Sequence, residues 1–135
     1  HDGLDFSFSG LKTSVMNHVR KHPDVSAADV AASFQTAVVD VLVAKAHRAA
    51  EQVGARGLAL GGGVAANSLL RERFLTMCTD VGVHGFLPSR AMCTDNAAMI
   101  AAAGWHRLRS DGPTSLDVGA TPTLRLPLLD DIGRA

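Results

Sequence analysis

The segment "LALGGGVAANSLLRERF", from Leu58 to Phe74, constrains the fold of this chain more than any other. A short apolar run enters three consecutive glycines, Gly61, Gly62 and Gly63, and a helical pattern follows directly. Glycine permits positive φ and lets a ligand or a second backbone approach closely. A glycine-rich turn that opens a helix also directs free N–H groups at whatever lies above it. The segment therefore predicts a strand-to-helix turn that either contacts a nucleotide or is a tight connection only.

The glycine turn matches neither of two familiar phosphate-binding fingerprints. Ala66 stands where a GxGxxG motif starting at Gly61 needs its third glycine, and no Gly-Lys-Ser/Thr follows. Asn67, in the first turn after the glycines, can bind a ribose or base through its amide, or can cap the helix without any ligand. The pattern alone leaves both interpretations open.

A second polar segment, "MCTDNAAMIAAAG" from Met92 to Gly104, precedes a helical run. Asp95 at this position suits the helix dipole, so the pattern favours a capping role. The alternative is that Asp95 supplies a hard oxygen ligand to a metal ion. The histidines of "HVRKH", His18 and His22, lie four apart, but the glutamate of HExxH is missing, which favours a solvated helix end.

Helices and short apolar strands alternate along the chain, which predicts an α/β fold. Strands are expected over residues 5–10, 57–61 and 83–89, and helices over 11–22, 27–53, 65–78 and 96–110. The run at 57–61 lacks polar alternation, as expected where both faces of a sheet are covered. Trp105 is expected in the core. About three strands are few for an open sheet, which indicates that part of the fold lies elsewhere.

Composition narrows the class of protein. The chain has 135 residues, with 13 Lys+Arg and 13 Asp+Glu, so bulk charge gives no argument for a nucleic-acid or membrane partner. No apolar run is expected to be long enough to span a bilayer, and no signal peptide is evident. Cys78 and Cys93 form neither a CxxC pair nor a zinc spacing, which fits a reducing compartment. Because the chain begins with His1, we expect a fragment or an isolated domain.

Four stretches resemble, in order, the C-terminal half of the TsaD-type tRNA N6-adenosine threonylcarbamoyltransferases, a family earlier labelled O-sialoglycoprotein endopeptidase or glycoprotease. They are "DFSFSGLKTSV", "ASFQTAVVDVLVAKAHRA", "LALGGGVAANSLLRERF" and "PSRAMCTDNAAMIAAAG". The resemblance covers most of residues 3–110. It implies the C-terminal lobe of an actin-like ATPase (ASKHA, ribonuclease-H-like) fold, truncated at its N-terminus. Residues 1–110 would form this partial lobe, and 111–135 a C-terminal tail that docks or is partly disordered.

The resemblance also assigns roles to individual residues. Gly61, Gly62 and Gly63 match the turn at which the family's nucleotide approaches the backbone, and Asn67 matches its substrate-contacting asparagine. Asp95 matches the aspartate that ligates Fe²⁺ or Zn²⁺, which reverses the preference for a simple cap. The family's histidine ligands and its "SGGHT"-like phosphate loop belong to an N-terminal lobe that this chain lacks. His18 and His22 have the spacing but the wrong place, so that role is not transferred to them.

The activity implied is transfer of a threonylcarbamoyl group from threonylcarbamoyl-adenylate to N6 of adenosine 37 of tRNA, with ATP/Mg²⁺ or the adenylate as ligand. The implied partners are tRNA, a TsaB-like paralogue, a TsaE-like ATPase subunit and the missing N-terminal lobe, in the cytoplasm and without a membrane. Alone, this chain is expected to be inactive, and no catalytic base is assigned.

Three other readings stay open. The chain can be a non-catalytic nucleotide-binding module of an actin-like ATPase. It can be a metalloprotease, as the older label says, although no HExxH is present. It can be a sugar kinase, against which "CTDNAAMIA" and "DFSFSGLKT" argue.

Overall fold

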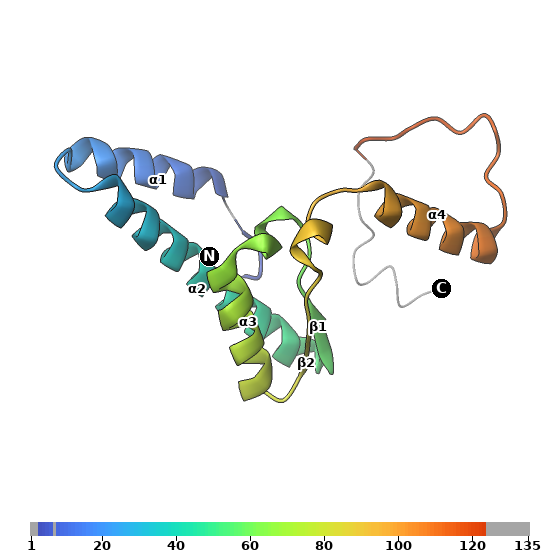
Figure 1. The fold of residues 1–135 in the computed structure, drawn as a ribbon, viewed down its shortest axis with the longest axis horizontal. Coiled ribbons are helices and arrows are strands. Elements are labelled where there is room, and N and C mark those ends of the chain that lie inside the picture. Colours follow the sequence, from blue (N-terminus) through green and yellow to red (C-terminus); the bar gives the residue numbers. More distant parts are fainter. Residues whose placement is uncertain (1–2, 7, 124–135) are drawn as a thin grey trace. The chain divides into compact units, whose positions relative to one another are not determined.

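The computed structural model describes residues 3–6 and 8–123, and the chain divides into two compact units, residues 1–95 and 96–135. The elements of the first unit are α1 (Phe8–Lys21), α2 (Ala27–Val53), β1 (Gly57–Ala59), the 3₁₀ turn η1 (Gly63–Ala66), α3 (Ser68–Asp80), β2 (His84–Phe86) and the 3₁₀ turn η2 (Arg90–Met92) (Figure 1). The second unit contains α4 (Ala97–Asp111). The chain is therefore α/β, as the sequence predicts. The predicted domain boundary at residue 110 stays a prediction.

The two strands of the described residues pair in parallel, with Leu58 opposite Gly85. A parallel pair needs a crossover connection, and α3 supplies it. One hydrogen bond continues the pairing past β1, from the Leu60 N–H to the Phe86 carbonyl at 3.0 Å. Both strands therefore end at the same edge of the sheet, and the glycine turn and the segment after β2 start there.

The core of the first unit lies where α3 meets α2 and the strand pair. Phe74, Met77 and Cys78 of α3 are buried at its centre. The half-buried apolar side chains around them come from α2, from the two strands and from the residues flanking these strands: Val43, Ala46, Leu58, Leu60, Val83 and Leu87. Burial raises the pKa of the Cys78 thiol, which keeps it protonated and unreactive at neutral pH.

Gly85 allows α3 to lie this close to β2. A Cβ added there would come within 3.1 Å of Leu75 Cδ2 and 3.2 Å of Cys78 Sγ. Contacts this short require the neighbours to move, so a larger residue at this position would separate the helix from the strand.

The other face of the strand pair is bare in the described residues. Gly57 and Ala59 of β1 and His84 and Phe86 of β2 are exposed, and 61% of the Phe86 surface is accessible. The prediction that both faces are covered is therefore wrong for this part of the chain. Strands at 57–59 and 84–86 confirm two of the three expected.

Local sequence signals determine where α2 begins and ends. The Ser26 hydroxyl accepts a hydrogen bond from the Ala28 N–H at 3.2 Å, the capping expected of serine. Gly54 closes the helix in the left-handed region at φ 58°, and its N–H bonds the carbonyls of the last turn. The predicted bounds, 27–53, are confirmed.

By length and composition, α2 is also apolar enough to cross a membrane, because an 18-residue window of it has a mean hydropathy of 1.5. By this criterion the prediction that no apolar run is long enough is wrong. The core helix of a soluble protein meets the same criterion. Charged side chains on α2 have partners within the chain: Asp40 pairs with Arg73 of α3, and Lys45 donates to the Asp5 carbonyl.

The strand predicted over 5–10 is wrong, because α1 already begins at Phe8. Two alternating phenylalanines are too short a pattern to separate a period of two from a helical one. The Phe6 ring instead stacks on that of Phe8, with centroids 6.2 Å apart, and Lys45 lies 4.9 Å above the Phe6 ring. Ser7 lies outside the described residues.

In the second unit, Asn96 caps α4 by accepting a hydrogen bond from the Met99 N–H at 3.0 Å. Trp105 is 53% exposed, with the Arg109 guanidinium 4.9 Å from its ring, so the prediction that it is a core residue is wrong here. Of the predicted tail, residues 124–135 lie outside the described part.

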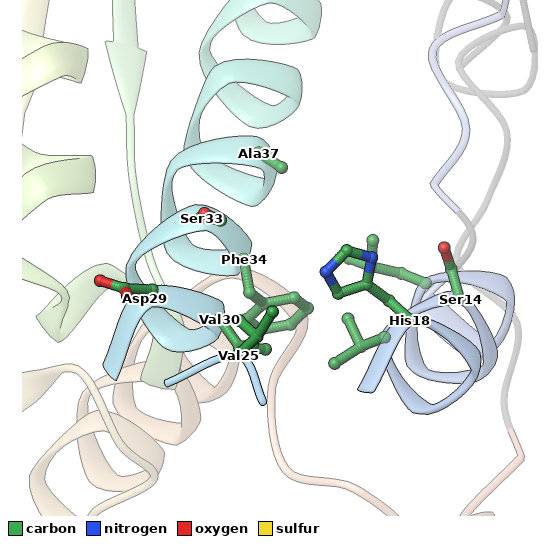
Figure 2. Close-up of a pocket in the computed structure, with 10 residues that line it drawn as sticks. Ser14, His18, Val25, Asp29, Val30, Ser33, Phe34 and Ala37 are labelled. Atoms are coloured by element: carbon green, nitrogen blue, oxygen red, sulfur yellow. The ribbon is translucent and has the colours of Figure 1, made fainter. Parts of the chain in front are cut away.

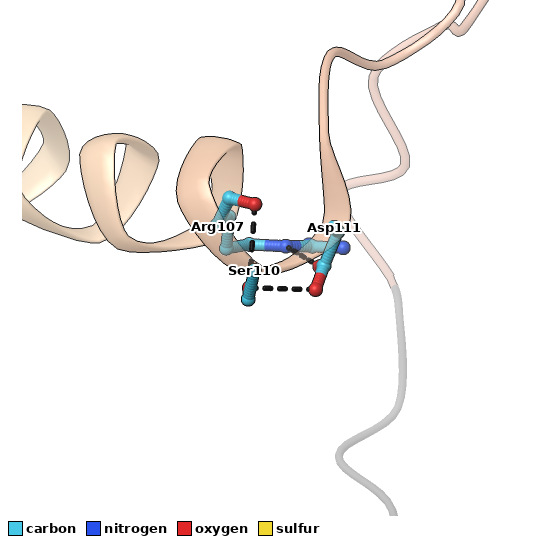
Figure 3. A network of polar contacts seen from close by, with 3 residues as sticks. All are labelled: Arg107, Ser110 and Asp111. Atoms are coloured by element: carbon cyan, nitrogen blue, oxygen red, sulfur yellow. Dashed lines mark hydrogen bonds and ion pairs between the residues drawn. The ribbon is translucent and has the colours of Figure 1, made fainter.

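A small polar network closes α4 at its C-terminus (Figure 3). The Ser110 hydroxyl lies 2.6 Å from Asp111 Oδ1, and Arg107 Nε donates to Asp111 Oδ2 at 3.3 Å. The hydrogen bond from Ser110, and then that from Arg107, lower the pKa of Asp111. The network therefore contributes at neutral pH and is lost as the pH falls through this lowered pKa.

Two phenylalanines test this description of the core. Phe74→Ala removes a ring that is 3% exposed, so we expect it to lower the free energy of unfolding by about 3–5 kcal/mol. The same change at the exposed Phe86 should cost about 1 kcal/mol or less. Urea unfolding followed by circular dichroism measures both. An equal loss at Phe86 would contradict the bare sheet face.

Candidate ligand site at the glycine turn

The glycine turn follows β1 at the carboxyl edge of the sheet. Gly62 has φ 82° and ψ 172°, a backbone conformation that only glycine adopts without strain. Gly61 and Gly63 have no positive φ. A Cβ at any of the three would meet nothing within 4 Å. Backbone conformation therefore explains one of the three glycines, and open space lies above all of them.

Asn67 caps α3 and uses both ends of its amide. Its Oδ1 accepts a hydrogen bond from the Leu70 N–H at 3.0 Å, and its Nδ2 donates to Gln35 Oε1 of α2 at 2.9 Å. The capping interpretation is thus confirmed. A primary amide has a second N–H and a second lone pair, so a cap can also contact a ligand. The two interpretations of Asn67 are compatible.

Arginine side chains join the glycine turn to the segment that follows β2. Arg71 of α3 donates from Nη1 to the Ala65 carbonyl at 3.0 Å and from Nη2 to the Pro88 carbonyl at 2.9 Å. Arg90 donates to the Ser68 hydroxyl at 2.8 Å. Two motifs that are far apart in sequence thus lie side by side at the carboxyl ends of two parallel strands, where ligands of open α/β sheets bind.

Sequence reasoning missed Gln35, Arg71 and Arg90. All three lie in stretches that carry the family resemblance, but none of them has a distinctive local signal. Each of the three makes a hydrogen bond to a residue that is distant in sequence. The separation is 32 residues for Gln35 and Asn67, 17 for Arg71 and Pro88, and 22 for Arg90 and Ser68. Such contacts depend on the fold rather than on the local pattern.

Asp95 ends the first unit, two residues after Cys93. The buried Cys93 thiol lies 3.4 Å from the Ser89 carbonyl and 3.9 Å from Arg71 Nη1, which ties residues 89–93 to the site. Asp95 itself is exposed. Among residues 3–6 and 8–123, no three His, Cys, Asp or Glu side chains gather where they could hold a metal ion. One carboxylate is too few donors for iron or zinc.

His18 and His22 lie at the C-terminal end of α1, with ring centroids 4.8 Å apart. Both are exposed, and neither belongs to a group of potential metal ligands in the described chain. The interpretation of "HVRKH" as a solvated helix end is consistent with this placement.

A separate apolar groove of about 370 Å³ lies between α1 and α2 (Figure 2). Its apolar lining includes Val25, Val30 and Phe34, with His18 facing these from α1. No residue of the glycine turn lines it, so this groove is distinct from the candidate site.

The α/β fold brings the glycine turn and the segment after β2 together at the carboxyl edge of a parallel pair of strands. The family model described as "TsaD: tRNA N6-adenosine threonylcarbamoyltransferase" matches residues 1–102, which include both loops. The chain belongs to this family.

Curated relatives carry the same name. The tRNA N6-adenosine threonylcarbamoyltransferase of Carboxydothermus hydrogenoformans is 48% identical over 125 residues, and that of Clostridium botulinum (strain 657 / Type Ba4) is 45% identical over 129 residues. In both cases the match covers 93% of this chain and 38% of the relative. The chain thus spans well under half the length of these relatives.

The three glycines give a matched test of the turn. Gly62→Ala places a Cβ on a residue with φ 82°, so we expect it to lower the free energy of unfolding by about 1–3 kcal/mol. Gly61→Ala and Gly63→Ala meet open space without positive φ and should change it by about 0.5 kcal/mol. Urea unfolding measures all three, and equal losses would mean that the turn has another conformation.

Proposed function

We propose that this chain is the C-terminal nucleotide- and substrate-binding part of an enzyme that transfers a threonylcarbamoyl group from threonylcarbamoyl-adenylate to N6 of adenosine 37 of tRNA. The observation that carries the proposal is the joining of the glycine turn to the segment after β2 at one edge of a parallel sheet. The names of the relatives supply the reaction class.

The proposed fold is part of the C-terminal lobe of an actin-like ATPase. The match to this chain covers 38% of the length of the relatives. The bare face around Phe86 supports the idea that further structure packs on these strands. In that arrangement the nucleotide lies between this lobe and a second one, so each lobe provides one wall of the cleft.

The chain's own residues bind and orient. Backbone N–H groups of Gly61, Gly62 and Gly63 face a phosphate, and no side chain keeps it at a distance. The second N–H of Asn67 reaches the adenylate or its carbamoyl group. In the reaction, N6 of adenosine attacks the carbamoyl carbon, the bond to the phosphate oxygen breaks, AMP leaves with that electron pair, and N6 loses a proton. No residue of this chain is assigned as the base.

A metal site at Asp95 is a further element of the proposal. Asp95 offers one carboxylate, and in the described residues it belongs to no group of three or more potential metal ligands. We propose that Asp95 completes a site for Fe²⁺ or Zn²⁺ whose histidine ligands lie outside this chain. A single carboxylate and one wall of a cleft pre-organise too little for catalysis, so this chain alone is proposed to be inactive.

The remaining elements follow from the family. The proposed partners are tRNA, a TsaB-like paralogue, a TsaE-like ATPase subunit and the rest of the same protein, working in the cytoplasm without a membrane. A second candidate is a non-catalytic nucleotide-binding module, which the open space above the glycine turn favours equally. No comparable observation supports the other candidate function, metal-dependent cleavage of proteins.

Two substitutions in the full-length protein test the proposed reaction. We expect Asn67→Ala and Asp95→Ala each to lower transfer to tRNA by about 100-fold, because each removes a group that orients the adenylate or its metal. The measurement is mass spectrometry of nucleosides from tRNA incubated with threonylcarbamoyl-adenylate. His22→Ala is the control. A full-length protein that binds nucleotide and transfers nothing would favour the non-catalytic module.

Calorimetric titration of ATP/Mg²⁺ into this chain tests the half-site. If the glycine turn and Asn67 bind nucleotide, Asn67→Ala should weaken the affinity by about 10-fold, the value of one hydrogen bond. Asn67→Asp keeps an oxygen to cap α3, loses the N–H donors and adds a negative charge, so it should weaken binding of the anionic nucleotide at least as much while α3 stays capped. Unchanged affinity in both folded variants would exclude Asn67 from the nucleotide site.

A further inference from the structure

We propose that Arg71 is the positioning residue of this site: its guanidinium fixes the separation of the two loops so that both act on one ligand. The inference rests on the proposed function. Arg71 donates to the Ala65 carbonyl of the glycine turn at 3.0 Å and to the Pro88 carbonyl after β2 at 2.9 Å. One side chain thus joins the loops that follow the two strands.

The chemistry of arginine suits this role. Its two terminal nitrogens lie in one rigid plane, so a single guanidinium holds two acceptors at a fixed spacing. The bonds are charge-assisted and half-buried, which makes them stronger than neutral ones. In the described chain, the bonds of Arg71 go to these carbonyls and to the Cys93 sulfur at 3.9 Å rather than to a carboxylate. The guanidinium charge therefore strengthens hydrogen bonds to main-chain carbonyls of the two loops.

The position of these carbonyls links Arg71 to the ligand-binding residues. Ala65 precedes Asn67 by two residues and is buried, so a shift of its carbonyl is transmitted to the asparagine. On the other side, Pro88 starts the segment that ends at Asp95. Gln35 binds the Asn67 amide and Arg90 binds the Ser68 hydroxyl at the start of α3, whereas Arg71 bonds the main chain of both loops.

The test compares arginine variants of the full-length protein in the tRNA transfer assay. Lysine keeps the charge but is a compact point donor that cannot hold both carbonyls at their spacing. We expect Arg71→Lys to lower kcat by about 10- to 100-fold, with KM changed far less. Arg71→Gln should lower it at least as much. Arg73→Lys, on the same helix with an exposed partner in Asp40, is the matched control and should retain wild-type kcat.

Two further readouts separate positioning from a loss of fold. Arg71→Lys should leave the melting temperature within a few degrees and raise amide hydrogen exchange in residues 61–66 and 88–93 together. Combined with Asn67→Ala, it should lower kcat by less than the product of the single effects, because both act through one turn. Fully active Arg71→Lys and Arg71→Gln would overturn the inference, as would a loss of fold in both. A wild-type protein that transfers nothing contradicts the proposed function instead, and exchange in both loops still tests the Arg71 bridge.

Discussion

The close approach of α3 to β2 at Gly85 is the contact on which the rest of the first unit depends. Because the crossover helix lies directly on the strand, Phe74, Met77 and Cys78 fill the space between α2 and the sheet. The same approach brings the first turn of α3 to the carboxyl edge of the sheet. Arg71 can therefore reach a carbonyl after each strand. The packing of α3 on β2 therefore determines both the core and the geometry of the candidate site.

Elements with strong local signals were predictable from the sequence. The Ser26 cap and Gly54 bound α2, and the paired apolar runs 57–61 and 83–89 contain the strands. Asn67 and Asn96 both accept from the N–H three residues on, as polar residues before a helical run suggest. In each case the decisive hydrogen bond is local, so the residue types alone determine it.

The contacts that assemble the site were not predictable in this way. Gln35 meets Asn67 across 32 residues, and Arg71 meets Pro88 across 17. No periodicity encodes such pairs, because they exist only after α2, α3 and the strands have packed. The strand predicted over residues 5–10 was wrong for a different reason. An alternation of two phenylalanines does not distinguish a strand from a helix, and the rings of Phe6 and Phe8 instead stack at the start of α1.

Three independent observations bear on how complete this site is. The glycine turn faces open space, one sheet face with Phe86 is bare, and Asp95 belongs to no group of three potential metal ligands in the described residues. Each would be costly or unexplained in a self-sufficient site, since an apolar face and an unused glycine turn contribute nothing by themselves. All three are accounted for at once if the proposed remainder of the protein covers the sheet, closes over the nucleotide and supplies the remaining metal ligands. In that arrangement Arg71 acts before the lobes meet, because the spacing of the two loops that receive the ligand is already set within this chain.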